Sequence, residues 1–309
     1  MSNNMRGYLY AALSSSSYGV NAFAVLLYAV GITADTVLFY RYAIASLLLG
    51  CIMLFRRDSF RLSFKEFLII CPMGLLFAFS SLSLFESYKY MGVSLAATVL
   101  FVYPAMVALI MWIFFRETPG KVTLFAIPVV FFGIVLLDWD GICEGGASLV
   151  GMLLVLLAAL SYAVYMVVVQ KSRLASMPSA KLSFYSLLFG LLLFVARTNF
   201  CLDVQPLTTP LQWGIVLALA IFPSLMSISS MAVAIHLVGS TATAVLGAFE
   251  PITSVLIGVC LYGERPPFVS WVGMVVILAS VTTVVAQNRI ACVGGRVVGY
   301  VKAHIHRGA

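Results

Sequence analysis

Along the chain, apolar residues form ten long stretches separated by short polar segments. These stretches cover approximately residues 7–30, 36–55, 66–86, 91–115, 121–138, 147–170, 181–200, 212–235, 240–262 and 268–286. A helix needs about 20 mostly apolar residues to cross the hydrocarbon core of a bilayer. The stretches are continuously apolar and do not alternate with a period of two, which favours helices over the strands of a membrane barrel. The pattern therefore predicts an all-α integral membrane protein with ten transmembrane helices.

One part of this pattern occurs twice. The 28 residues from Gly92 to Pro119 align without a gap with Gly239 to Pro266, 147 positions later. The matched pairs are Gly92 and Gly239, Ala97 and Ala244, Pro104 and Pro251, Glu117 and Glu264, and Pro119 and Pro266. A weaker echo at an offset of 144 pairs Gly7, Ser17 and Tyr18 with Gly151, Ser161 and Tyr162. We therefore expect two related five-helix repeats, residues 1–140 and 141–288, followed by a basic tail over 289–309.

The number of spans in each half determines how the halves are related. Five is odd, so the second half begins on the opposite side of the membrane from the first, and the repeats are inverted. Inverted repeats are a recurrent design of secondary transporters, because exchanging the conformations of the two halves opens the protein to the other side. Channels and membrane enzymes can also contain repeats, so the topology favours transport without deciding it.

Composition and charge add an orientation to this picture. With 62% hydrophobic and 9% charged residues and a mean hydropathy of +1.09, the chain has too little polar surface for a soluble globule. If the N-terminus is cytoplasmic, 14 of the 18 Lys and Arg residues fall on the inner side. Only Lys89, Arg197 and Arg265 fall outside, and Arg41 lies within a span. The positive-inside rule then predicts that both termini are cytoplasmic, which explains the net charge of +7 without a nucleic-acid partner.

Several kinds of chemistry find no support in the sequence. The six cysteines have no metal-like spacing, although Cys143 and Cys201 both fall in loops predicted to face outward, which leaves a disulfide between them open. There is no P-loop motif for an ATP-driven cycle. The three histidines, at positions 236, 304 and 306, do not assemble a catalytic set. We expect no catalytic residues, no metal and no cofactor.

The repeated span resembles a known family. Small residues, a mid-helix proline and a terminal glutamate occur in both copies: Ala96, Ala97, Pro104 and Glu117, and then Ala242, Ala244, Pro251 and Glu264. Together with the FYRYAIASLLL segment around Arg41, these marks are similar to the drug/metabolite transporter superfamily, of the ten-helix type called EamA, over residues 7–286. The resemblance implies a basket of ten helices around a central cavity lined by helices 1, 3, 4, 6, 8 and 9. It also implies the movement, usually outward, of small metabolites such as amino acids.

Glu250 is the most informative single residue. It lies about ten positions inside the span over 240–262, and a carboxylate near the bilayer midplane is costly unless it faces water, is paired or is protonated. Thr243, Gly247, Glu250 and Ser254 recur at spacings of four, three and four, so we expect them to share one face. Pro251 frees a backbone carbonyl near Gly247 and is expected to bend the helix. We expect Glu250 to bind a substrate ammonium or a proton; the alternative is a carboxyl hydrogen-bonded to a neighbouring helix.

Arg41 lies about five residues into the second span. We favour snorkelling to the outer interface or a contact with a helix end, since long basic side chains near helix ends commonly do this. If Arg41 instead points inward, it is a partner for a substrate carboxylate.

Further candidates lie on polar stripes. Ser14, Ser17, Tyr18 and Asn21 form one stripe, Ser161, Tyr162 and Tyr165 a second, Ser80, Ser83 and Ser87 a third, and Ser224, Ser227 and Met231 a fourth. Serines of this kind are also ordinary contacts between membrane helices, and we favour that role for Ser14, Ser17 and Ser161. The larger side chains of Asn21, Tyr162 and Tyr165 are better able to reach a ligand from a cavity wall. The stripes of Ser83 and Ser227 suit a cavity and a close helix contact equally, and both serines, with Tyr18, are also candidates for substrate binding.

The repeat assigns roles to four more residues. Tyr103 occupies the position equivalent to Glu250 and is therefore a candidate for substrate binding. Pro104 and Pro251 are matched hinge candidates. Glu117 and its equivalent Glu264 stand at helix C-termini, where the helix dipole is unfavourable for a carboxylate, so we expect both to contact the start of the following helix in a structural role.

The sequence as a whole predicts a secondary active transporter in the bacterial inner (plasma) membrane. We expect it to export amino acids or similar small metabolites by alternating access, with protons as a candidate coupling ion and membrane lipids as its surroundings. A passive facilitator or channel is the alternative, and a membrane-embedded enzyme is the less favoured one.

Overall fold

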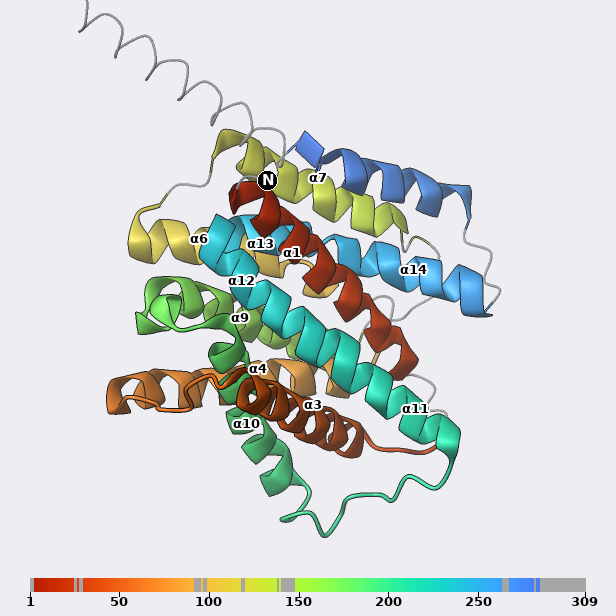
Figure 1. Ribbon diagram of the computed structural model, residues 1–309. Coiled ribbons are helices and arrows are strands. Elements are labelled where there is room, and N and C mark those ends of the chain that lie inside the picture. The colour runs from red at the N-terminus through yellow and green to blue at the C-terminus, as the bar shows by residue number, and fades with distance from the viewer. Residues whose placement is uncertain are drawn as a thin grey trace, which may run out of the picture.

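The computed structural model describes residues 3–24, 27, 30–91, 96, 99–117, 120–137, 139, 148–262, 267–280 and 282–283. All regular secondary structure in this part of the chain is helical (Figure 1). The first half contains α1 (Asn3–Tyr18), η1 (Gly19–Phe23), α3 (Ala34–Arg56), α4 (Phe64–Ser87), α6 (Tyr103–Phe115) and α7 (Lys121–Leu137). The second half contains α9 (Leu149–Lys171), η2 (Arg173–Ser176), α10 (Ser179–Arg197), α11 (Pro210–Leu219), η3 (Ala220–Met226), α12 (Ser227–Val238), α13 (Ser240–Leu246), α14 (Phe249–Tyr262) and a last helix over 268–280.

These elements occupy the ten predicted spans and confirm an all-α membrane fold. Where the described helices start and stop, they differ from the predicted bounds by a few residues, because capping residues and not hydropathy fix the ends. Thr33 caps α3 through its side chain, and Ser63 with Glu66 forms a capping box at the start of α4. Five of the described helical stretches are long and apolar enough to cross a membrane by themselves.

The two halves are related by matched close contacts. A Cβ atom added to Gly7 on α1 would lie 2.5 Å from a methyl of Val238, and one added to Gly151 on α9 would lie 3.1 Å from the sulfur of Met91. Gly7 and Gly151 are 144 positions apart, and Met91 and Val238 are 147 apart, which are the two offsets of the sequence repeat. Each repeat therefore places the first helix of one half against the third helical span of the other, with glycine permitting the close approach.

Two interhelical hydrogen bonds repeat the same relationship. Ser14 on α1 donates to the carbonyl of Ser227 on α12 at 2.9 Å, and Ser80 on α4 donates to the carbonyl of Ala158 on α9 at 2.8 Å. Ser14 and Ala158 are again 144 positions apart, and Ser80 and Ser227 are 147 apart. Figure 1 shows α1 lying along α12. The Ser14 bond agrees with the role between helices that we favoured for this serine.

The last helix of each half packs against the other. A Cβ atom at Gly133 on α7 would lie 3.1 Å from the carbonyl oxygen of Gly273, and Ser280 donates a hydrogen bond of 3.2 Å to the carbonyl of Ala126. In the repeat, Gly133 corresponds to Ser280 and Ala126 corresponds to Gly273, each at the offset of 147, so the two contacts are equivalent. Figure 1 shows α7 beside the helix over 268–280. The fold therefore consists of two inverted five-helix repeats with approximate two-fold symmetry.

Ion pairs gather at the ends of the helices. Arg197 at the end of α10 binds Asp35 at the start of α3 through two hydrogen bonds of 2.6 and 3.0 Å. The same guanidinium lies 3.8 Å from Glu86, which pairs with Lys89 at 2.6 Å as its i, i+3 spacing predicts. Lys89 and Arg197, which the charge pattern assigns to one side of the membrane, thus belong to one network.

A second set of ion pairs joins residues assigned to the other side. Lys171 at the end of α9 binds Glu117, and Lys181 lies 3.7 Å from Glu66 at the start of α4. The described partner of the Glu117 carboxylate is therefore the ammonium of Lys171 on α9. The expected contact with the start of the following helix involves residues outside the described ones and stays a prediction.

Candidate functional site

The ninth span is broken at its centre. Helix α13 ends at Leu246 and α14 begins at Phe249. Because Pro251 has no N–H, the carbonyl of Gly247 is not used in an α-helical bond; it accepts the N–H of Glu250 at 2.9 Å instead. The expected bend before Pro251 is confirmed, and it is a full interruption. The turn between α13 and α14 has i→i+3 hydrogen bonds, so the shared face of Thr243 and Glu250 stays a prediction.

The first repeat has the corresponding break. Residues 101 and 102 form a turn, and α6 begins at Tyr103 with Pro104 in its first turn. Proline is favoured at this place because the first N–H groups of a helix have no intrahelical acceptor. The two helices that carry the matched prolines are thus both discontinuous, a feature that marks substrate and ion sites in transporters built from inverted repeats.

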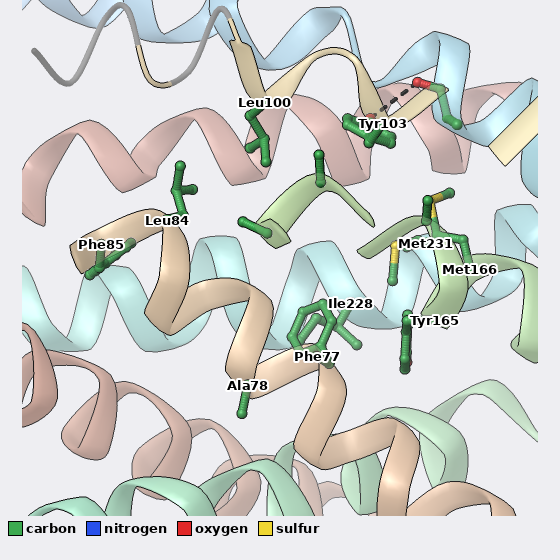
Figure 2. Packing of buried hydrophobic residues seen from close by; sticks show 14 of the residues in the cluster. Phe77, Ala78, Leu84, Phe85, Leu100, Tyr103, Tyr165, Met166, Ile228 and Met231 are labelled. Carbon is green, nitrogen blue, oxygen red and sulfur yellow. Dashed lines mark hydrogen bonds between the residues drawn. The ribbon is translucent and has the colours of Figure 1, made fainter. Parts of the chain in front are cut away.

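Tyr103 connects the two breaks. Its hydroxyl donates a hydrogen bond of 3.1 Å to the carbonyl of Ala244, which Figure 2 marks with a dashed line at Tyr103. A Cβ atom at Gly247 would lie only 1.6 Å from the same hydroxyl. The residue at 247 must therefore lack a side chain for Tyr103 to reach its acceptor.

Glu250 lies in the first turn of α14, next to the end of the first span. The dipole of α14 favours a negative charge at this position. A Cβ atom at Gly19 in η1 would lie 2.8 Å from the carbonyl oxygen of Glu250 and 2.8 Å from Cβ of Thr253. Glycine at position 19 thus allows backbone-to-backbone contact, which brings Tyr18 and Asn21 on either side of Gly19 to the Glu250 segment. Glu250 interacts electrostatically with Tyr18 and Arg41, but the described residues contain no ion pair to its carboxylate.

Arg41 points into the protein, so the expectation of snorkelling is wrong. Its side chain has no exposed surface. Its Nε donates to Ser224 at 2.6 Å, one terminal nitrogen donates to Oδ1 of Asn21 at 2.9 Å, and the other donates to the carbonyl of Pro223 at 3.4 Å. The guanidinium also lies over the ring of Tyr18, 5.5 Å from its centroid. Buried acceptors compensate the desolvation that an isolated cation would suffer at this depth.

Two of the three acceptors for Arg41 come from a distortion that sequence reasoning missed. Pro223 lies inside the eighth span, and the chain around it, η3, adopts π-helical geometry. The carbonyl of Leu219, which would bond to residue 223 in an α-helix, accepts the Ser224 hydroxyl at 3.2 Å. Single π-helical turns are frequent at functional sites. The available signal was a proline within an apolar span that also carries a polar stripe.

Aromatic side chains form the other part of the cluster. The Tyr162 ring meets Tyr103 edge to face at 5.0 Å, and its hydroxyl lies 3.0 Å from the sulfur of Met231. Phe77 lies 5.0 Å from Tyr165 and 6.1 Å from Tyr162. Figure 2 shows Phe77, Tyr165 and Met231 among these buried side chains.

The repeat relates the two parts to each other. Tyr18 corresponds to Tyr162, and Glu250 corresponds to Tyr103. The contact between the rings of Tyr103 and Tyr162 therefore has its counterpart in the interaction between Glu250 and Tyr18, and each of the two joins one half to the other. A symmetric framework thus carries an asymmetric site, charged on one side and aromatic on the other.

Three candidates have no described hydrogen bond to the charged part of the cluster. Ser227 bonds with Ser14 between α12 and α1, and Tyr165 bonds with Ser186 on α10 at 2.9 Å. Ser83 is buried on α4, and no hydrogen bond among the described residues joins it to Arg41 or Glu250. Their hydroxyls serve helix packing, or have no described link to the charged part of the site.

Some candidates lie outside the described residues. These are Ala97, Cys143, Glu264, Pro119 and Pro266, and the basic tail over 289–309. Cys201, the other half of the disulfide that we left open, is a free and exposed thiol. Within the described chain, no group of three His, Cys, Asp or Glu residues is placed to hold a metal ion.

Comparison with known proteins agrees with this architecture. A solved structure, described only as a crystal structure of a protein, aligns over 94% of this chain and 99% of its own with a TM-score of 0.74 and 16% identity. At that identity the likeness concerns the fold alone. No curated protein matches the chain significantly. The model of the EamA-like transporter family matches residues 5–138 and again residues 149–286, once for each repeat. The chain is therefore a member of the EamA-like transporter family, a membrane transporter of small solutes.

Proposed function

We propose that the protein is a secondary active transporter that exports amino acids or similar small metabolites across the bacterial inner membrane. The observation that carries the proposal is the position of Glu250. Its carboxylate lies at the interruption of a membrane helix, beside Tyr18 and within the field of Arg41, without a described ion pair. An intramembrane carboxylate of this kind marks a substrate or ion pathway by default, because burying it has no benefit for stability alone.

The paired breaks support alternating access as the transport mechanism. Each repeat contributes one discontinuous helix, and the two meet where Tyr103 binds the carbonyl of Ala244. If the repeats exchange conformations, the helix breaks move relative to each other while the ends of the bundle open and close. The ion pairs at the two ends, Asp35 with Arg197 and Glu66 with Lys181, would then separate on opposite sides in turn.

Proton coupling is the role that we assign to Glu250 in this cycle. A carboxylate without a close counter-ion binds either a proton or a cationic group, and the two compete. Competition for one carboxylate is a simple way to link substrate release on one side to proton entry from that side.

The distribution of bases further supports a cytoplasmic location for both termini.

A passive facilitator is the second candidate. It requires a pathway open to both sides at once, whereas Arg41 at the centre of the described bundle has no exposed surface. A membrane-embedded enzyme would require a nucleophile beside a base or a metal, and the polar residues around Arg41 and Glu250 include neither arrangement.

Transport by purified protein distinguishes these functions. Proteoliposomes are loaded with a mixture of radiolabelled amino acids, and efflux or uptake is followed with and without an imposed proton gradient. We expect accumulation against the substrate gradient that collapses when an uncoupler is added. Equilibration without accumulation would support the facilitator, and movement of no solute in the mixture would contradict amino-acid transport.

A further inference from the structure

Arg41 has donors to spare. A guanidinium carries five N–H groups. Ser224, Asn21 and the carbonyl of Pro223 accept three hydrogen bonds from it, each through a different nitrogen, and the hydroxyl of Tyr18 also interacts with it as a hydrogen-bond acceptor. At least one N–H on a terminal nitrogen therefore remains for an oxygen of a carboxylate.

The charge of Arg41 has no close counter-ion. None of the ion pairs in the described chain includes it. Glu250 acts on Arg41 only through its field, because no hydrogen bond joins the two side chains. The three neutral acceptors orient the guanidinium but supply no negative charge. A fully buried cation in this state favours the arrival of an anion.

Asn21 adds a second set of unused donors at the same place. Its Oδ1 accepts from Arg41, which fixes the orientation of the amide, since an Nδ2 group facing the guanidinium would oppose donor to donor. The Nδ2 of Asn21 is buried and has no hydrogen-bond partner among the described residues. A buried N–H group without an acceptor is costly, so its presence beside an incompletely used guanidinium indicates a site for an acceptor that comes from outside the chain.

We propose that Arg41 and Asn21 form an anion subsite that receives the carboxylate of the transported solute. This inference rests on the proposed transport function and names the chemical group that the site selects. The subsite lies at the charged part of the cluster, so the remainder of a bound solute extends toward Tyr162, Met231 and Phe77. A solute with a carboxylate and an apolar body fits this arrangement, and an ammonium group, where present, is attracted by Glu250.

The subsite is closed in this conformation, because Arg41 has no exposed surface. Carboxylates therefore reach it only when the helices around it separate. Arg41 is held by η1, which belongs to the first span, and by η3, which belongs to the eighth. These two spans pack on each other through Ser14 and Ser227. Separation of the first span from the eighth would open the subsite, and it would break the hydrogen bonds that Arg41 makes with one of the two.

Asn21→Asp is the variant that tests the subsite. The aspartate keeps the oxygen that accepts from Arg41, so the structural role of residue 21 is preserved. It also places a carboxylate where the solute's carboxylate would bind, and it removes the Nδ2 donors. A purely structural role for Arg41 and Asn21 predicts a stable variant with unchanged ligand binding. If the subsite exists, the variant is stable but no longer binds solutes through their carboxylates.

The measurement is binding to purified full-length protein by thermal shift and equilibrium dialysis, with leucine, 4-methylpentanoate and isopentylamine as probes. These share one apolar body and carry both charged groups, the carboxylate only, or the amine only. In the wild type we expect leucine and 4-methylpentanoate to bind. In Asn21→Asp we expect both affinities to fall at least about tenfold, while the affinity for isopentylamine is equal or higher.

The outcomes separate this inference from the proposed function. Unchanged carboxylate binding in Asn21→Asp would overturn the subsite, as would a wild type that binds neither carboxylate. If Asn21→Asp fails to fold, Asn21→Ser, which removes the Nδ2 donors and adds no charge, must weaken both carboxylates. If carboxylate binding depends on residue 21 but the protein transports nothing in proteoliposomes, the subsite is supported and the transport function is contradicted.

Discussion

The hydroxyl of Tyr103 occupies the space that a side chain at residue 247 would need, 1.6 Å from an ideal Cβ at Gly247. This relationship joins the two repeats at the point where each has a broken helix. Tyr103 begins α6 in the first half, and its acceptor, the carbonyl of Ala244, closes α13 in the second. The hydrogen bond therefore reports the relative position of the two halves at their centre.

A double-mutant cycle tests this junction. Tyr103→Phe removes the hydroxyl, and we expect it to lower the free energy of unfolding by about 1 kcal/mol, the scale of a buried interhelical hydrogen bond. Gly247→Ala should cost more, about 2 kcal/mol or above, because Tyr103 must move away. In the Tyr103→Phe background, Gly247→Ala should cost at least about 1 kcal/mol less. Additive effects of the two substitutions in SDS titrations would show that the two residues do not meet.

Close helix contacts make a second prediction about stability. A Cβ atom at Gly74 on α4 would lie 2.8 Å from the backbone carbonyl of Ser186 on α10, whereas a Cβ atom at Gly214 on α11 meets no atom within 4 Å. We expect Gly74→Ala to destabilise the protein by about 1–3 kcal/mol, because a backbone must shift. Gly214→Ala is the matched control, which should be neutral or stabilising by up to about 1 kcal/mol through its helix propensity. Equal thermal stabilities of the two variants in detergent would contradict the packing of α4 on α10.

The sequence predicted the framework well for a physical reason. Hydropathy and the positions of Gly7, Ser14 and their repeat equivalents depend on local composition and on close approach, both of which are visible in a linear pattern. The break at Gly247 was also anticipated, because Pro251 removes one hydrogen bond at a known distance along the helix. These features follow from rules that act within a few residues.

The site was harder to predict, because its geometry depends on contacts between distant spans. Arg41 near a helix end permits either snorkelling or burial, and only the π-helical turn at Pro223, 182 positions away, determines which occurs. The same applies to Glu117, whose partner Lys171 is 54 positions away. Spacing along a single helix contains no information about either pair.

The orientation of the protein in the membrane can be tested with its own cysteine. Cys201 is exposed in the segment between α10 and α11, which the distribution of bases assigns to the outer side. In a Cys143→Ser background, we expect an impermeant maleimide to label Cys201 on intact cells. A Ser59→Cys variant in a background with Cys143→Ser, Cys201→Ser and Cys292→Ser, with the new thiol between α3 and α4, should be labelled only after permeabilisation. Labelling with the opposite pattern would place both termini outside.

The matched prolines test the mechanical part of the proposal. Pro104→Ala with Pro251→Ala restores two backbone N–H groups and allows both broken helices to become more continuous. If the breaks act as hinges, we expect the double variant to turn over at least about tenfold more slowly while binding changes by less than about threefold. Each single variant should have a turnover rate between those of the wild type and the double variant. Transport at the wild-type rate in the double variant would remove the hinge role.

The most direct test of the central claim is the pH dependence of transport in Glu250→Gln. Glutamine keeps the shape of the side chain and removes both the charge and the titration. Glu117→Gln serves as the matched control, since its partly exposed ion pair with Lys171 contributes little to stability. The initial rate of solute movement is measured in proteoliposomes from acidic to alkaline pH for wild type and both variants. We predict that Glu250→Gln folds and reconstitutes but loses transport or its dependence on pH, whereas Glu117→Gln behaves as the wild type. Normal, pH-dependent transport by Glu250→Gln would contradict the account.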